Sequence, residues 1–326
     1  MNLLKIAVAP CYWPDEEQLL GRELERVAPG RVELRVARSK SELLELLGDS
    51  EVFYGDRLTA AHLGAAPVLA WAHLNVAGVE RSLTPQLAAR GVVLTNSRAM
   101  HRVHVAEHVL GLMLAFAKRN HIALRRQLER VWAQAEIVST SFSLRGLTCG
   151  VLGLGGIGLE VARLAHAFGM RCIATRRRPD AGAASFVERV FGEDGLQAVL
   201  LESDFLVICL PLTAKTRGLI GARELALMKP GAHLVNIARG AIVDEDALLA
   251  ALGSGRLAGA GLDVTQREPL PADSPLWTAE NVLLTPHVSG NYPGYAVDAA
   301  RVFADNVARY LAGQPLENVV DQSEGY

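Results

Sequence analysis

Short apolar runs rich in Val, Ile and Leu alternate with longer amphipathic stretches along nearly the whole chain. Continuous apolar runs are typical of parallel strands that helices bury on both faces, and a period near 3.6 residues is typical of the helices between them. The alternation therefore predicts an α/β protein built from doubly wound parallel sheets. A first series of strands is expected over residues 6–9, 32–36, 52–54, 68–71 and 92–95.

A second series of strands follows after a long gap. It is expected over residues 148–153, 171–175, 205–210, 233–237, 259–263 and 282–285. In the gap, apolar residues at helical spacing predict a long helical segment over about residues 99–132, which would link two domains. A final amphipathic helix is predicted over residues 295–311, before the stop signals Gly313 and Pro315.

Composition fits this picture and excludes several classes of protein. With 326 residues, 50% of them hydrophobic, the chain has enough apolar material for about two packed domains. The formal net charge is −2, so no bulk attraction for a polyanion exists and nucleic acid is not an expected partner. The four cysteines lack metal-like spacing, and the N-terminus lacks the apolar core of a signal peptide. No apolar run is long enough for a membrane span, so we expect a cytoplasmic protein without a membrane partner.

A glycine-rich motif stands between a predicted strand and a predicted helix over residues 159–168. Residues 153–158 read Gly-Leu-Gly-Gly-Ile-Gly. In this context the first glycine permits a tight turn, the second lets a pyrophosphate approach the backbone, and the third allows close contact between helix and strand. The alternative is a turn that merely packs a helix on a sheet. The motif predicts a dinucleotide site that includes Gly153, Gly155, Gly156, Ile157 and Gly158.

The next strand indicates which dinucleotide binds. An NAD site normally places an acidic residue about 20 residues further on, where it bonds the ribose hydroxyls. This chain has no Asp or Glu between Glu160 and Asp180, and arginines follow the strand at residues 171–175. Because guanidinium groups pair well with a 2′-phosphate, we expect NADP(H) to be favoured over NAD(H). Arg176 and Arg177 are the expected phosphate ligands, with Thr175 as a hydroxyl donor; the alternative is a solvated basic patch.

Three downstream segments carry candidate catalytic groups. Residues 235–240 read Val-Asn-Ile-Ala-Arg-Gly, residues 261–270 contain Gly-Leu-Asp-Val and Arg-Glu-Pro-Leu, and residues 285–290 read Thr-Pro-His-Val-Ser-Gly. With the glycine turn, these segments resemble the D-isomer-specific 2-hydroxyacid dehydrogenase family, and in character its NADPH-dependent glyoxylate and hydroxypyruvate reductases. The resemblance implies a Rossmann domain, residues 98–287, inserted in a flavodoxin-like substrate domain, residues 1–97 and 288–326.

The resemblance places Arg239, Glu268 and His287 in the active site, and their chemistry agrees with that role. A 2-oxo acid needs a cation for its carboxylate and a proton donor for its carbonyl oxygen, beside a hydride donor. Arg239 offers the cation, His287 exchanges the proton, and Glu268 would orient and tune His287. Each residue alone could be an ordinary ion pair or loop residue. Together they predict hydride transfer between NAD(P)H and a small 2-oxo or 2-hydroxy acid; a corepressor-like dinucleotide-sensing protein is the alternative.

The resemblance implies further binding residues. Residues 71–80 are similar to the family's substrate loop, whose backbone N–H groups cradle a carboxylate, so Ala77 and Gly78 are expected to bind substrate. Asn75 and Val76 depart from the usual pattern of that loop. Pro211 would line the nicotinamide pocket.

Asp263 would contact the carboxamide, again by family resemblance. A homodimer through the dinucleotide-binding domain is also implied, with Trp132 either reaching the partner's active site or serving as an ordinary interface aromatic. A metal is not expected, because His101, His104 and His108 have no acidic or cysteine partner at ligand spacing.

Overall fold

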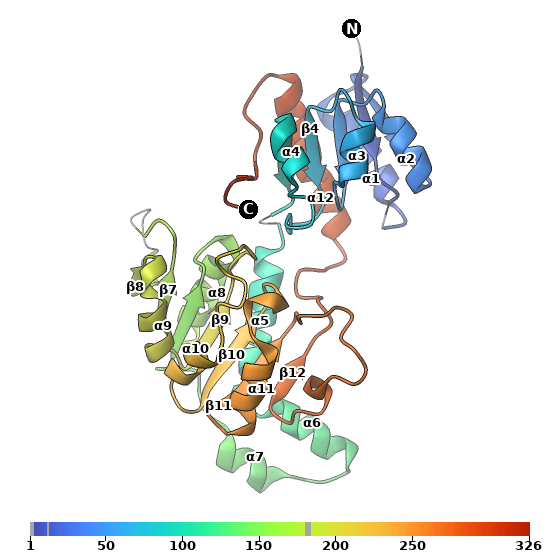
Figure 1. Cartoon of the computed structure of the whole chain (residues 1–326). Helices are drawn as coiled ribbons and strands as arrows, with labels where there is room; N and C mark the ends of the chain where they lie inside the picture. The colour runs from blue at the N-terminus through green and yellow to red at the C-terminus, as the bar shows by residue number, and fades with distance from the viewer. Residues whose placement is uncertain (1–2, 12, 99, 180–183) are drawn as a thin grey trace. The chain divides into compact units, whose positions relative to one another are not determined.

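The computed structural model describes residues 3–11, 13–98, 100–179 and 184–326 and forms two compact units (Figure 1). Unit 1 comprises residues 1–100 and 292–326, and unit 2 comprises residues 101–291. The boundaries predicted at residues 97 and 287 lie within a few residues of these divisions. All neighbouring strands in both sheets are parallel, which confirms the predicted fold class.

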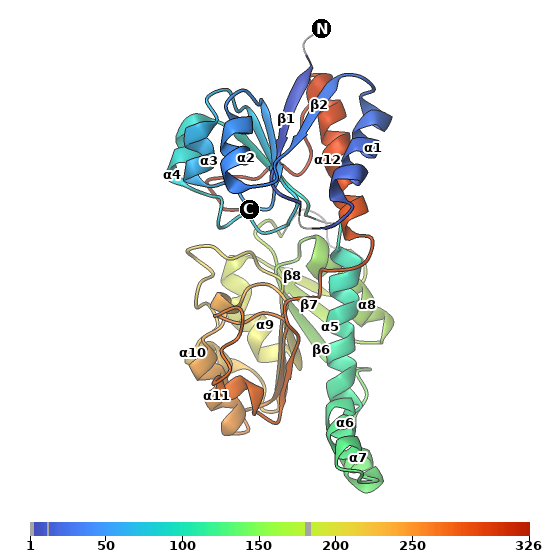
Figure 2. The ribbon, with the colours of Figure 1, turned by 90° about the vertical axis from the view of Figure 1, so that its right-hand side faces the viewer.

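Unit 1 is built on a five-stranded sheet in the order β2-β1-β3-β4-β5. Its strands are β1 (Leu4–Val8), β2 (Val32–Val36), β3 (Val52–Gly55), β4 (Trp71–Leu74) and β5 (Val93–Asn96). One face is covered by α1 (Glu16–Val27) and α12 (Tyr295–Leu311), and the other by α2 (Lys40–Leu47), α3 (Ala60–Ala65) and α4 (Pro85–Arg90), as Figure 2 shows. Ile6 and Val8 point into one core and Ala7 into the other, as the two-residue period of a strand requires.

Unit 2 is built on a seven-stranded sheet in the order β12-β11-β10-β9-β6-β7-β8. The strands are β6 (Thr148–Leu152), β7 (Arg171–Thr175), β8 (Arg189–Phe191), β9 (Phe205–Ile208), β10 (Ala232–Asn236), β11 (Leu257–Leu262) and β12 (Val282–Leu284). α5 (Arg102–Ala117) and α8 (Gly156–Ala167) bury one face, and α9 (Leu196–Glu202), α10 (Ala222–Leu227) and α11 (Glu245–Gly253) bury the other. The strand order reverses between β6 and β9, and ligands of such folds bind beside this reversal.

Several elements differ from the sequence prediction. The strand predicted over residues 68–71 is wrong, because β4 begins at Trp71, where it pairs with Val52 and Val93. The long helix predicted over residues 99–132 is interrupted by Arg119, whose φ of 55° is left-handed. It consists of α5 and α6 (Asn120–Leu128), and α7 (Gln134–Thr140) follows unpredicted. The short edge strand β8 was also missed, whereas α12 has the predicted bounds.

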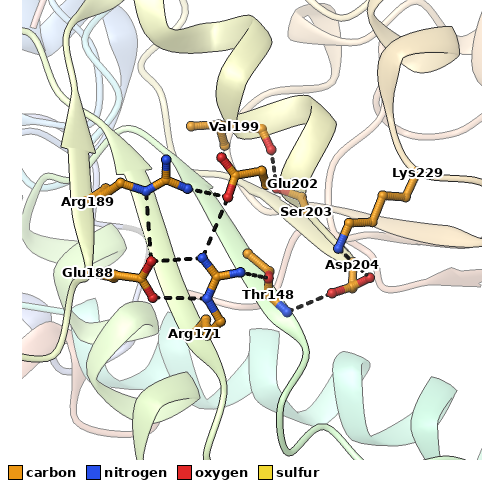
Figure 3. A network of polar contacts seen from close by, with 9 residues as sticks. All are labelled: Thr148, Arg171, Glu188, Arg189, Val199, Glu202, Ser203, Asp204 and Lys229. Carbon is orange, nitrogen blue, oxygen red and sulfur yellow. Dashed lines mark hydrogen bonds and ion pairs between the residues drawn. The ribbon is translucent and has the colours of Figure 1, made fainter.

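Ion pairs and hydrogen bonds connect residues at or just before the amino ends of β6, β7, β8, β9 and β10 in unit 2 (Figure 3). Arg171 contacts Glu188 at 2.8 Å and Glu202 at 3.6 Å, and Glu202 also pairs with Arg189. Asp204 accepts from the backbone N–H of Thr148 at 2.8 Å and from Lys229 at 3.0 Å. These contacts occupy the amino end of the sheet, whereas the predicted catalytic groups follow the carboxyl ends of strands. Among the described residues, no helix is long and apolar enough to span a membrane.

Candidate active site

The glycine turn lies between β6 and α8, next to the reversal of strand order. Gly153 has a φ of 95°, and a Cβ placed there would lie 3.0 Å from the carbonyl oxygen of Cys209 after β9. A Cβ on Gly158 would lie 2.2 Å from the carbonyl oxygen of Gly153, so any larger residue would push α8 away from the turn. These two positions therefore need glycine for backbone conformation and packing.

The middle of the turn is open. A Cβ on Gly155 or Gly156 would meet no atom within 4 Å among the described residues. Gly155 is the N-cap of α8 and has no side chain to bond the first-turn N–H groups of the helix. Ile157 packs partly against the core beneath α5 and α8. The combination of open backbone and an uncapped helix N-terminus fits the pyrophosphate of a dinucleotide.

The end of β7 is joined to the glycine turn. Thr175 is buried, its carbonyl oxygen accepts from the N–H groups of Gly153 and Leu154, and its hydroxyl oxygen accepts from Gly153 N–H at 3.2 Å. The Arg176 backbone bonds Phe191 of β8 at 2.8 Å. Arg176 and Arg177 follow the last residue of β7, so both lie at the carboxyl end of the sheet beside the turn. Arg176 is half-buried and Arg177 is exposed.

Hydrogen bonds of a threonine hydroxyl group stabilise the loop after β9. Thr216 donates to the carbonyl oxygen of Pro211 at 2.6 Å and accepts from Thr213 N–H at 2.8 Å. Pro211 itself is half-buried. The loop therefore has a fixed backbone next to the reversal of strand order.

Arg239 follows β10 in a tightly supported segment. The buried Asn236 side chain donates to the carbonyl oxygen of Arg239 at 3.0 Å and accepts from Ala238 N–H at 3.1 Å. A Cβ on Gly240 would lie 1.9 Å from the carbonyl carbon of Thr265, so the two segments are in direct contact. The packing brings the Arg239 segment against the chain that leads to Glu268.

Glu268 and His287 form a hydrogen-bonded pair. His287 Nδ1 lies 2.7 Å from Glu268 Oε2, and Glu268 Oε1 accepts from Thr265 N–H at 3.1 Å. Because a carboxylate only accepts hydrogen bonds, Nδ1 carries the proton of this contact. The other ring nitrogen, Nε2, is then the atom that can release a proton to a substrate or take one back. The His287 side chain is 49% exposed, which leaves it accessible.

A buried carboxylate shapes the loop that carries His287. Asp263 accepts from Thr285 Oγ1 at 2.6 Å and from the N–H groups of Val288 and Ser289, each at 3.0 Å. Burial raises the pKa of Asp263, but hydrogen bonds from the Ser289 and Thr285 side chains and from the two N–H groups outweigh it, so its pKa lies below the ordinary value. The contact of Asp263 with a carboxamide stays a prediction. The sequence analysis did not predict that Asp263 would stabilise the loop at residues 285–289.

A second partner of this loop was also missed. His108 Nε2 lies 3.0 Å from Thr285 Oγ1 and 3.8 Å from Asp263 Oδ1. Thr285 in the Thr-Pro-His motif was the available signal, since its hydroxyl group can donate to a carboxylate and accept from an imidazole at the same time. His108 thereby has a structural contact within unit 2. Among the described residues, no group of three or more His, Cys, Asp or Glu side chains could hold a metal ion.

The loop that contains Ala77 and Gly78 follows β4 in unit 1. Within the described part of the chain, no acceptor bonds the N–H groups of Val76, Ala77 and Gly78. The preceding carbonyl oxygens all accept hydrogen bonds from the protein: Asn75 from Tyr295 OH at 2.9 Å, Val76 from Ser97 N–H at 3.2 Å, and Ala77 from Asn96 Nδ2 at 2.7 Å. Because C=O and N–H point in opposite directions in a trans peptide, the three N–H groups point away from those donors. Such a row of N–H groups can bind an anion.

Comparison with known proteins identifies the family. Residues 110–289 match the NAD binding domain of the D-isomer specific 2-hydroxyacid dehydrogenases. A glyoxylate/hydroxypyruvate reductase B from Pectobacterium atrosepticum is 41% identical over 271 residues, which cover 82% of this chain and 83% of the relative. The chain belongs to the D-isomer-specific 2-hydroxyacid dehydrogenase family. Membership confirms the predicted family and makes the chain an NAD(P)-dependent oxidoreductase that binds a nicotinamide dinucleotide.

Solved structures of the dehydrogenase family have the same fold as this chain. A D-isomer specific 2-hydroxyacid dehydrogenase from Xanthobacter autotrophicus, in complex with NADPH and MES, has a TM-score of 0.83 and 31% identity, with 98% of this chain and 99% of that chain covered. An NADPH-dependent glyoxylate/hydroxypyruvate reductase from Sinorhizobium meliloti, in complex with NADP and sulfate, has a TM-score of 0.84 and 27% identity over 99% of each chain. Both resemble the whole of this chain.

Proposed function

We propose that this dehydrogenase reduces a small 2-oxo acid with NADPH and that glyoxylate or hydroxypyruvate is its substrate. The observation that carries the proposal is the 2.7 Å contact between His287 Nδ1 and Glu268 Oε2, in the unit that contains the glycine turn. It leaves Nε2 as the proton-transferring atom. The names of the similar proteins from Pectobacterium atrosepticum and Sinorhizobium meliloti support the choice of substrate.

Arg239 and His287 would act on the substrate itself. Arg239 binds the carboxylate and the carbonyl oxygen through its planar fork of donors. The reduced nicotinamide supplies the hydride to the carbonyl carbon when it is bound. His287 Nε2 gives its proton to the carbonyl oxygen, so the C=O group becomes a C–OH group, and the same atom takes the proton back in the reverse direction. Glu268 holds the imidazole through Nδ1 and fixes which nitrogen faces the substrate.

The cofactor is proposed to lie along the carboxyl end of the unit 2 sheet. The N–H groups of the turn at residues 153–158 would hold its pyrophosphate, and Arg176 and Arg177 would pair with its 2′-phosphate. Thr175 would add a hydroxyl group there, Pro211 would line the nicotinamide pocket and Asp263 would contact the carboxamide. The complexes of the two solved relatives with NADPH and NADP support the choice of phosphorylated cofactor.

The loop at residues 75–78 is proposed to bind the substrate carboxylate. The N–H groups of Ala77 and Gly78, which bond no acceptor in the part of the chain that the structure describes, support this assignment. We also propose a homodimer formed through unit 2, for which the exposed apolar residues of α6 and α7 provide support.

Turnover with a panel of 2-oxo acids, each assayed with NADPH and NADH, tests the proposal directly. We expect the highest kcat/KM for glyoxylate or hydroxypyruvate with NADPH. Arg239→Ala should lower kcat/KM by about 10²- to 10³-fold, because an aligned charged donor is lost, while NADPH affinity stays unchanged. Absence of turnover with every acid, together with tight NADPH binding, would favour the dinucleotide-sensing protein instead.

The cofactor assignment has its own test. Arg176→Asp should raise the KM for NADPH about 10- to 100-fold and leave the KM for NADH nearly unchanged, because hydrogen bonds to a charged partner are lost. Arg178→Asp is the matched control, since Arg178 is an exposed arginine in the same segment. An unchanged NADPH preference in Arg176→Asp would refute the role of that arginine.

A further inference from the structure

A buried polar cluster in unit 1 takes no part in the mechanism above. It consists of Glu16, Tyr54, Asn75 and Tyr295, and we call it the Glu16 cluster. Each of these residues is at most 6% exposed. Glu16 opens α1, Tyr54 lies in β3 next to its last residue, Asn75 follows β4, and Tyr295 opens α12. The cluster therefore gathers at the carboxyl end of the unit 1 sheet and includes the first residue of the loop at residues 75–78.

The contacts within the cluster have a defined direction. Glu16 Oε1 accepts from Asn75 Nδ2 at 2.9 Å and from Tyr54 OH at 3.1 Å. Tyr295 OH donates to the carbonyl oxygen of Asn75 at 2.9 Å. Burial and then the charge of Glu16 raise the pKa of Tyr54 well above its ordinary value, and burial raises that of Tyr295 to about 12. Both phenols therefore stay protonated and act as donors.

The side-chain amide of Asn75 is oriented by Glu16. A flipped amide would place Oδ1 against the Glu16 carboxylate, which can only accept, so Nδ2 must face Glu16. The Oδ1 atom is buried and has no hydrogen-bond partner among the described residues. A buried polar atom without a partner is unfavourable and is typical of a residue kept for function.

We propose that Glu16, Asn75 and Tyr295 are positioning residues that hold the loop at residues 75–78 in the conformation that binds the substrate carboxylate. This inference rests on the proposed function. Asn75 is held at two points, by Glu16 through its side chain and by Tyr295 through its carbonyl oxygen. The Asn75 carbonyl group shares a peptide plane with Val76 N–H. The hydrogen bond from Tyr295 to this carbonyl oxygen therefore also fixes the direction of Val76 N–H, which points toward the substrate.

The charges explain why an amide stands at position 75. A carboxylate there would lie against the buried Glu16 carboxylate and directly behind a loop that binds an anion. Repulsion in a buried site is strong, because water cannot screen it. The neutral amide of Asn75 gives Glu16 a donor and keeps a second negative charge away from the substrate.

Four variants test the inference by steady-state kinetics with glyoxylate and NADPH. Glu16→Ala and Asn75→Ala should each raise the KM for glyoxylate about tenfold, with kcat within about threefold and the Kd for NADPH unchanged. The double variant should be no worse than either single one, because both remove the same contact. Glu16→Gln keeps an acceptor for Asn75 and should restore KM to within about threefold. Glu17→Ala is the control, because Glu17 is a half-buried neighbour on α1 whose carboxylate pairs with Arg38 outside the cluster.

Tyr295→Phe removes one hydroxyl group and should fold even where the alanine variants do not. It should raise the KM for glyoxylate several-fold with little change in kcat, because the hydrogen bond to the Asn75 carbonyl oxygen is lost. A purely structural role would lower the melting temperature without this selective rise in KM. If the wild type is active and KM is unchanged in all variants, the inference is overturned while the proposed function stands.

Hydrogen exchange makes the test independent of activity. The Asn75 N–H donates to the carbonyl oxygen of Gly55, and the Ser97 N–H is shared between the carbonyl oxygens of Leu74 and Val76, so both report on the chain where the loop leaves β4. Both should exchange faster in Glu16→Ala and Tyr295→Phe and at the wild-type rate in Glu17→Ala. If the wild type turns over no 2-oxo acid, the proposed function fails. Unchanged exchange in every variant would then overturn the positioning role as well.

Discussion

The backbone of His287 lies in the left-handed region, with a φ of 53°, which a residue with a side chain seldom adopts. A single residue, Asp263, stabilises this conformation. Its carbonyl oxygen accepts from His287 N–H at 2.8 Å, and its carboxylate accepts from the N–H groups of Val288 and Ser289. One buried acid therefore fixes the chain on both sides of the histidine. Local strain of this kind is common where a side chain must be aimed at a substrate.

Replacement of Asp263 by Asn tests this role. An amide can accept at only one of its two atoms, so a buried donor of residues 285–289 loses its partner. We expect Asp263→Asn to lower the free energy of unfolding by about 1–3 kcal/mol and to reduce kcat at least tenfold. Urea titration and steady-state kinetics measure the two effects, and the exposed Asp273→Asn is the control. A variant with normal kcat would show that the loop does not depend on this acid.

His73 provides a pH-dependent prediction in unit 1. It is buried between Thr95 Oγ1 at 2.8 Å and Ser97 Oγ at 3.1 Å, and burial lowers its pKa to about 3. The unfolded chain takes up a proton near pH 6.5 but the folded chain does not, so the free energy of unfolding falls as the pH drops from 6.5 toward 3. The contribution is about 1.4 kcal/mol per pH unit.

His73→Gln should reduce the slope of the free energy of unfolding against pH by up to about 1.4 kcal/mol per pH unit between pH 6 and about 4, since an amide does not titrate there. Urea midpoints that follow the fluorescence of the buried Trp71 measure it. A slope equal to that of the wild type would show that His73 does not set the acid sensitivity of unit 1.

At the scale of elements, the strands of unit 2 other than β8 were predicted because parallel strands buried on both faces are continuous apolar runs, whereas β8 is a three-residue edge strand. The predicted strand at residues 68–71 starts too early, because the apolar residues 68–70 precede β4 in the sequence. Val68 is 54% exposed, so this part of the apolar run is not in the core. The break at Arg119 was invisible because any residue type can end a helix when tertiary contacts compensate. Here Arg119 Nε donates to the carbonyl oxygen of Thr140 at 2.9 Å.

The glycine turn gives a prediction that separates packing from ligand binding. Gly158→Ala places a Cβ 2.2 Å from the carbonyl oxygen of Gly153 and should destabilise unit 2 by about 1–3 kcal/mol and weaken NADPH binding. Gly155→Ala meets no atom within 4 Å, so it should leave stability nearly unchanged while it weakens NADPH binding at least tenfold. Thermal melts and fluorescence titration with NADPH check both variants.

Gly111→Ala is the control for these substitutions, because its Cβ in α5 would also meet no atom within 4 Å among the described residues. It should leave NADPH binding unchanged. If Gly155→Ala bound NADPH as tightly as this control, the pyrophosphate would not approach the turn at residue 155.

At the scale of the whole molecule, both sheets reverse their strand order once, between β1 and β3 in unit 1 and between β6 and β9 in unit 2. Periodicity predicts strands but not their order, and the family resemblance supplied that information. Arg239, Glu268 and His287 were predicted from sequence as catalytic residues because each stands in a local motif, and each follows a strand of unit 2 in the fold. The Glu16–Asn75 contact spans 59 residues and has no motif, so only the folded chain reveals it.

Unit 2 carries an apolar surface that no part of its own core covers. α6 and α7 extend from the end of unit 2 (Figures 1 and 2), and α7 has no buried residue. Exposed apolar side chains follow one another along this segment: Leu124, Leu128, Val131, Trp132 and Val138, with Leu128 86% and Trp132 90% exposed. Large exposed apolar patches are rare on monomeric proteins, and aromatic residues are enriched at interfaces, so this segment is a candidate interface.

A second copy of the chain is the partner that the proposed homodimer requires, and a two-fold arrangement would let the same patch cover itself. Leu128→Asp combined with Trp132→Ser should therefore convert the dimer to a monomer at micromolar concentration, because two charges would be buried at the symmetric interface. Sedimentation velocity measures the change. Val68→Asp, at an exposed apolar residue of unit 1, should leave the dimer intact. A wild type that sediments as a monomer, or a double variant that still sediments as a dimer, would remove α6 and α7 as the interface.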